Sequence, residues 1–106
     1  MIENIFENVP DTILTEEITN ILHSAENFRI ERIISQGQTS PAEGWYDQDE
    51  NEWVILLDGF AGITFEDDSE ILLNKGDYLL IPAHKKHKVT FTTNKRKSIW
   101  LAIFYK

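Results

Sequence analysis

Two stretches of the sequence decide the fold: residues 52–59, Glu-Trp-Val-Ile-Leu-Leu-Asp-Gly, and residues 76–87, Gly-Asp-Tyr-Leu-Leu-Ile-Pro-Ala-His-Lys-Lys-His. Each joins a short apolar run to turn-forming residues, and each run has the length of a strand. In 52–57 both alternating faces are apolar apart from Glu52, which is typical of a strand covered on both sides. We therefore expect short, buried β-strands joined by tight turns.

The same alternation of apolar runs and turn residues continues along the chain. Asp58-Gly59, Asp67-Asp68 and Asn74-Lys75-Gly76 are turn signals. The sequence predicts seven strands, at residues 28–35, 52–57, 61–65, 70–73, 78–81, 87–92 and 98–105. Short strands with frequent turns predict an all-β sandwich or small barrel.

The first part of the chain gives a different pattern. Residues 15–24 begin with Thr15, a helix-capping residue, and place Ile18, Ile21 and Leu22 on one side. This pattern predicts a short helix. We therefore divide the chain into an N-terminal arm with a short helix, residues 1–27, and a β-barrel, residues 28–106.

Length and composition restrict the possible classes of protein. With 106 residues, 42% of them hydrophobic, the chain has enough apolar surface for one globular domain. Because it has no cysteine, disulfides and thiolate zinc sites are excluded. The net charge of −8 repels phosphate backbones, so we expect no nucleic-acid partner.

No apolar run reaches the roughly 18 residues that cross a bilayer, and the N-terminus is acidic where a signal peptide is basic. We therefore expect a cytoplasmic protein without a membrane partner.

Glu52 and His87 are the two polar residues that the strand pattern directs inward. Alternation puts Glu52 on a face with Val54 and Leu56, and His87 on a face with Val89 and Phe91. A buried carboxylate is costly unless it is paired, hydrogen-bonded or bound to a cation. A convergence of Glu52 and His87 in one cavity would therefore make a candidate site, whereas separately each residue is an ordinary strand residue.

Six residues in these two stretches are spaced as in the two sequence motifs of the cupin family, which the chain therefore resembles. These residues are Glu52 and Gly59 for the first motif, and Gly76, Asp77, Pro82 and His87 for the second. The sequence thus resembles a single-domain cupin over about residues 28–105, and the resemblance implies a jelly-roll β-barrel.

The sequence departs from this pattern at the metal ligands. The first cupin motif has two histidines ahead of the glutamate, and this chain has Trp45 and Asp47 there, or Tyr46 and Gln48 if the gap is one residue shorter. In the second motif His84 replaces a glycine. Of the four usual ligands only Glu52 and His87 remain.

Two functions stay open on this resemblance. In the first, Asp47, Glu52 and His87 hold a divalent metal, manganese, iron or zinc, in an enzyme that acts on a small molecule. In the second, the barrel binds or senses a small ligand without a metal centre. Pocket candidates in both are Trp45, Tyr46, Gln48, Tyr78 and His84. Cupins of this size commonly pair, so we also expect a homodimer.

Overall fold

The computed structural model describes residues 1–106 and contains eight β-strands and no helix. The strands are β1 (Ile18–Ala25), β2 (Phe28–Ser35), β3 (Asn51–Asp58), β4 (Ala61–Phe65), β5 (Glu70–Leu73), β6 (Tyr78–Ile81), β7 (His87–Thr92) and β8 (Ser98–Tyr105). All seven predicted strands are present, and only β3 differs, by one residue at each end. The predicted all-β fold is confirmed.

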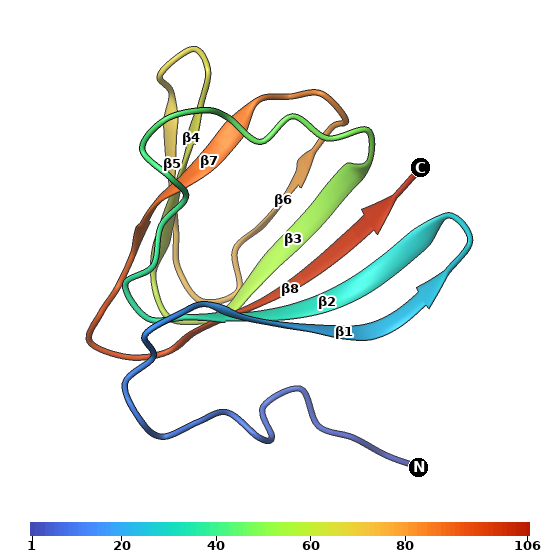
Figure 1. Ribbon diagram of the computed structural model, residues 1–106, viewed down its shortest axis with the longest axis vertical. Coiled ribbons are helices and arrows are strands. Elements are labelled where there is room, and N and C mark those ends of the chain that lie inside the picture. Colours follow the sequence, from blue (N-terminus) through green and yellow to red (C-terminus); the bar gives the residue numbers. More distant parts are fainter.

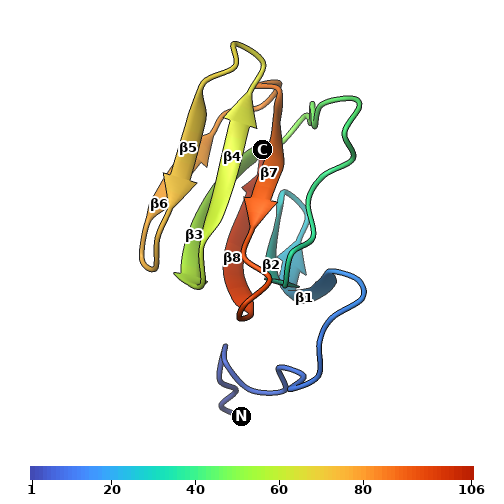
Figure 2. The same ribbon diagram turned by 90° about the vertical axis from the view of Figure 1, so that its left-hand side faces the viewer.

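The strands form two antiparallel sheets that face each other. One has the order β1-β2-β8-β3-β6 and the other the order β5-β4-β7. Figures 1 and 2 show the smaller sheet lying over the larger one. The facing sides bury ten hydrophobic residues in one core: Val54, Leu56, Ala61, Ile63, Phe65, Leu73, Ile81, Trp100, Ala102 and Phe104. The chain is therefore a jelly-roll β-sandwich closed around a shared interior.

The predicted helix over residues 15–24 is wrong, because residues 18–25 form strand β1. β1 pairs with β2, with Ile18 opposite Ile34 and Thr19 opposite Ile33. A helix of one or two turns is marginal in water, and β-branched isoleucine and threonine favour a strand where a sheet edge is free. The chain contains no helix that could span a bilayer.

Strand β7 carries an irregularity that changes one predicted orientation. β4 pairs Ile63 with Val89 but Gly62 with Phe91, so one extra residue, Thr90, bulges out of β7. His87 keeps its predicted inward orientation and is buried, whereas Phe91 is turned out and is 45% exposed. The expectation that Phe91 shares the inward face is therefore wrong.

The connection between β2 and β3, residues 36–50, runs along the free edge of β7 (Figure 1, green). The Ser40 amide donates to the Val89 carbonyl, and Tyr46 and His87 exchange two backbone hydrogen bonds of 2.8 and 3.2 Å. This pairing brings the residues just before β3 next to His87.

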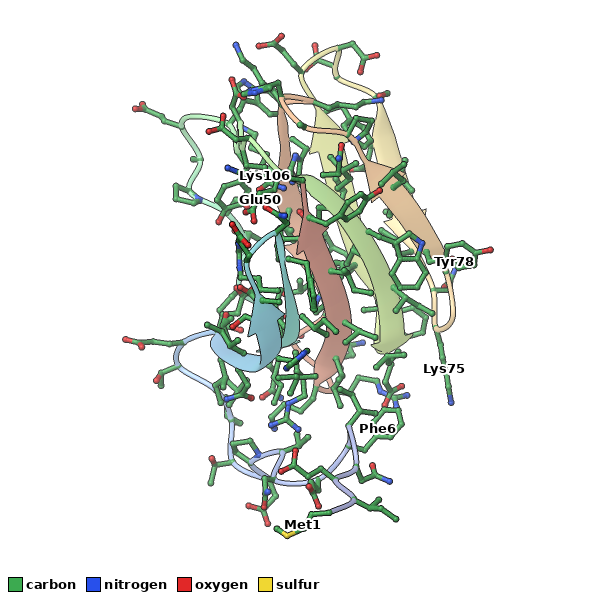
Figure 3. All side chains as sticks on the ribbon, turned by 90° about the vertical axis from the view of Figure 1, so that its right-hand side faces the viewer. Met1, Phe6, Glu50, Lys75, Tyr78 and Lys106 are labelled. Atoms are coloured by element: carbon green, nitrogen blue, oxygen red, sulfur yellow. The ribbon has the colours of Figure 1, made fainter.

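The arm before β1 lies beneath the larger sheet, on the side away from the smaller sheet (Figures 1 and 3). It is held by Arg32, which is 8% exposed and donates to the carbonyl oxygens of Ile5 and Glu7.

Candidate functional site

A cavity of about 490 Å³ lies between the two sheets. Its apolar wall includes Val54, Ile63, Ile81, Trp100 and Phe104 from both sheets. Its polar residues are Glu17, Thr19, Arg29, Glu31, Gln38, Thr39, Ser40, Gln48, Glu52 and His87. A concave space of this size, in which apolar walls and converging polar groups are combined, is a usual form of small-molecule site.

Glu52 and His87 meet in this cavity, although 35 positions separate them in the sequence. His87 Nε2 lies 3.6 Å from Glu52 Oε1, and the two side chains are only 5% and 13% exposed. The pair arises because β3 and β7 belong to opposite sheets and each directs one polar residue inward. Gln48 Nε2 also donates to Glu52 Oε1, at 3.3 Å.

The surroundings of His87 favour its protonated form. Burial alone would lower the pKa of His87, but the Glu52 carboxylate and the Lys85 carbonyl oxygen, which lies 2.9 Å from Nδ1, together raise it above its ordinary value. The ring is enclosed by two aromatic neighbours, with centroids 5.8 Å away for Tyr46 and 6.5 Å for Phe65. The site thus holds an imidazole with a raised pKa beside a carboxylate, in a cavity that has both apolar and polar walls.

This raised pKa predicts that the protein becomes less stable as the pH increases above neutrality. A group that binds its proton more tightly in the folded state stabilises the fold below its unfolded pKa, about 6.5, and this contribution is lost as the pH rises through the folded pKa. Urea unfolding between pH 6 and 8.5 should show the decrease, and the Glu52→Gln variant should show a smaller one. An equal decrease in both proteins would contradict the assignment of the shift to Glu52.

The structure distinguishes the two alignments that the first motif left open. Tyr46 and Gln48 line the cavity, whereas Trp45 and Asp47 do not. The reason is the backbone pairing of Tyr46 with His87, which sets the alternation of this segment. Tyr46 and Gln48 therefore occupy the positions of the two cupin histidines.

The structure does not bring Asp47 next to Glu52 and His87, the other two predicted metal ligands. Its Oδ1 lies 2.8 Å from His84 Nδ1, and His84 also approaches Asp49 at 3.3 Å on the outside of the cavity. No group of three or more histidine, aspartate or glutamate side chains is placed to share a cation. The donors that lie next to each other, the Glu52 carboxylate and the His87 imidazole, do not fit the three or four protein ligands of a usual zinc, iron or manganese centre.

Of the five pocket candidates, Tyr46 and Gln48 line the cavity and the other three lie outside it. Trp45 is covered by Lys88, whose Nζ lies 4.3 Å from the ring centroid. Tyr78 is 65% exposed and packs on Trp53. His84 has a positive φ of 64° in the turn after β6, so it acts as a turn residue.

The charged residues that β2 contributes to the cavity were not predicted from the sequence. Arg29, Glu31 and Ile33 alternate on the inward face of β2. Arg29 Nε contacts Glu31 and its Nη1 contacts Glu50, both at 2.6 Å. The period-two spacing of Arg29 and Glu31 was the available signal, but charged residues on alternate strand positions usually face solvent.

Residues 31–104 match the cupin domain family. Over its whole length the chain is similar to a "putative mannose-6-phosphate isomerase" of Ralstonia eutropha, with 38% identity, 98% of that protein covered and a TM-score of 0.94. No curated protein matches the chain.

Two more distant structures share the fold. An RmlC-like cupin family protein of Methanocaldococcus jannaschii, with a double-stranded β-helix fold, has 19% identity and a TM-score of 0.74, over 99% of this chain and 92% of that one. The polyketide cyclase RemF of Streptomyces resistomycificus has 16% identity and a TM-score of 0.72, over 92% and 70%.

Proposed function

Since the chain belongs to the cupin family, we propose that it binds a small polar organic molecule in the cavity between its sheets, with the Glu52–His87 pair at the polar end. The observation that carries this proposal is the burial of that pair inside a cavity of about 490 Å³. His87 Nε2 and Glu52 Oε1 lie 3.6 Å apart and both residues line the cavity, so a polar group of a ligand can bind to this pair.

The donor set favours ligand binding without a resident metal. Tyr46 and Gln48 replace the two histidines of the first motif, and the Gln48 amide donates to Glu52 instead of leaving that carboxylate free for a cation. We therefore expect protein purified without a histidine tag to contain far less than one manganese, iron or zinc per chain. Stoichiometric metal that is lost in both Glu52→Gln and His87→Ala would contradict this part of the proposal and support a metal-dependent enzyme.

A phosphorylated sugar, the kind of molecule in the name of the Ralstonia eutropha protein, does not suit this cavity. Its one lining arginine, Arg29, is already paired with Glu31 and Glu50. Three lining carboxylates, those of Glu17, Glu31 and Glu52, would repel a phosphate group.

A second candidate is acid–base catalysis on the bound molecule. It is favoured by the raised pKa of His87, which keeps a proton available beside the Glu52 carboxylate. His87 would donate a proton to the ligand and Glu52 would accept one, a pairing that suits proton transfer at adjacent atoms. This proton transfer requires no metal ion.

The test of ligand binding uses thermal shift and amide chemical-shift mapping with a panel of small polar molecules. Binders should raise the melting temperature and shift the signals of cavity residues. The His87→Gln variant should bind them at least tenfold more weakly. His23→Gln, on the exposed face of β1, is the matched control and should bind normally. A panel without binders, or shifts outside the cavity, would contradict the proposal. If the protein converts a binder to a product and the Glu52→Gln variant does not, the protein is an acid–base enzyme.

We also propose that the protein is a homodimer that pairs through the outward face of the larger sheet. By strand register this face presents Trp53, Ile55, Leu101 and Ile103, which are only half-buried, beside the exposed Leu80 and Tyr78. Tyr78 is labelled in Figure 3. An apolar patch of this kind on a monomer is expected to be covered.

Light scattering should give twice the chain mass of 12.3 kDa. Leu80→Glu, which puts a charge on this face, should give a monomer. Leu72→Glu on β5 is the control, because Leu72 is 66% exposed on the other sheet, and it should remain dimeric. A monomeric wild-type protein would contradict the proposal.

A further inference from the structure

We infer that the molecule bound in the cavity carries a positively charged amino group. This inference rests on the proposed function and names the class of ligand. The lining contains three carboxylates, those of Glu17, Glu31 and Glu52, against one guanidinium, that of Arg29. Even with His87 protonated the negative charges are in excess, in a protein whose net charge is −8. The field inside the cavity therefore attracts a cation and repels an anion.

Arg29 is not available as a receptor for an anionic ligand. Its Nε and Nη1 atoms each contact a carboxylate at 2.6 Å, one from Glu31 and one from Glu50. Its planar face is also covered, because the guanidinium carbon lies 4.1 Å from the centroid of the Phe104 ring. Since two negative charges surround this one positive charge, the Arg29 cluster as a whole is negative.

Glu17 is a carboxylate that lacks a cation. It directly precedes β1 and lines the cavity, but it has no hydrogen-bond or ion-pair partner. Glu17 is exposed, although partial burial raises the pKa of its carboxyl group, and the protein places no positive charge beside it. An ammonium group of a ligand would supply that charge.

The rest of the lining suits an organic cation and not a bare metal ion. His87, with a side chain only 5% exposed, lines the cavity beside Glu52, its Nε2 lying 3.6 Å from Glu52 Oε1, so a second polar group of the ligand can bind to this pair. The rings of Tyr46 and Trp100 lie in the same lining and can contact the apolar part or the ammonium group. The carboxylates are not close enough together to share one metal ion.

Three probes of the same shape and different charge test the inference: benzylamine, benzyl alcohol and benzoate, titrated into the full chain at pH 7 and low salt. Benzylamine should bind at least tenfold more tightly than benzoate and severalfold more tightly than benzyl alcohol, with shifts at the amides of cavity residues. Added NaCl should weaken the binding of benzylamine and leave that of benzyl alcohol unchanged.

Variants of the acidic residues give an independent readout. Glu17→Gln should weaken the binding of benzylamine and leave the binding of benzyl alcohol unchanged. Glu31→Gln also frees the Nε of Arg29, so the preference for benzylamine over benzoate should fall at least fivefold. Glu26→Gln removes the same charge in the exposed turn between β1 and β2 and should change nothing.

The outcomes separate the two proposals. If benzyl alcohol or benzoate binds in the cavity as tightly as benzylamine, the inference is wrong and the proposed function stands. If no probe binds in the cavity, both are contradicted.

Discussion

Replacing Gly59 by alanine should lower the free energy of unfolding by about 2–5 kcal/mol, a large part of the total stability of a domain of this size. Gly59 directly follows β3 in the turn that leads to β4, and it is buried. Its φ of +94° lies in the region that side-chain-bearing residues avoid, which costs about 1–2 kcal/mol for alanine. The added Cβ would also lie 2.6 Å from the Cα atom of Ser98 at the start of β8.

The steric part of this cost has no easy relief. Ser98 is fully buried, and its Cα belongs to the backbone of the central strand β8. This Cα therefore cannot move without disturbing the sheet. Gly76→Ala is the matched control. Gly76 has a nearly identical φ of +90°, but nothing lies within 4 Å of an added Cβ, so only the conformational cost applies. Urea unfolding of both variants measures the difference, and equal losses would show that the contact with Ser98 does not contribute.

The positions of the strands could be predicted because each is a short apolar run closed by a turn with strong local preferences. Gly59 and Gly76 show this directly, since both adopt the positive φ that a turn of this type requires. β1 could not be predicted in the same way. The spacing of Ile18, Ile21 and Leu22 suits a helix, and only the free edge of β2, a feature of the assembled sheet, makes these residues a strand.

The candidate site could be predicted in part for a similar reason. Glu52 and His87 occupy regular strands, where alternation determines the inward face, and the structure brings them together. The segment before β3 is irregular, so a shift of one residue in its register decides whether Asp47 or Gln48 faces the cavity. Only the pairing of this segment with β7 determines that it is Gln48. Arg29 was missed because its partner Glu50 comes from that same irregular segment.

Arg32→Met should lower the free energy of unfolding by about 2–4 kcal/mol and release the N-terminal arm from the sheet. Arg32 is buried on the outward face of β2 and has no carboxylate partner. It donates instead to the carbonyl oxygens of Ile5 and Glu7, at 3.0 and 2.5 Å, and twice to Asn20 Oδ1. Methionine keeps much of the side-chain volume but leaves these acceptors without a donor, so the arm loses its main attachment.

Hydrogen–deuterium exchange over residues 1–17 distinguishes release of the arm from a general loss of stability. In Arg32→Met, exchange should increase in the arm well before it increases in the central strands β3 and β8, because the arm can separate while the sheets remain paired. Arg96→Met is the control. Arg96 pairs with Asp58 through two contacts of 2.7 and 2.8 Å, but it is 55% exposed, so its loss should cost less than about 1 kcal/mol and leave the arm protected. Equal exchange in the arms of the two variants would mean that the buried guanidinium does not hold the arm, and that other contacts, such as those of Leu14 with Gln36 and Gln38, suffice.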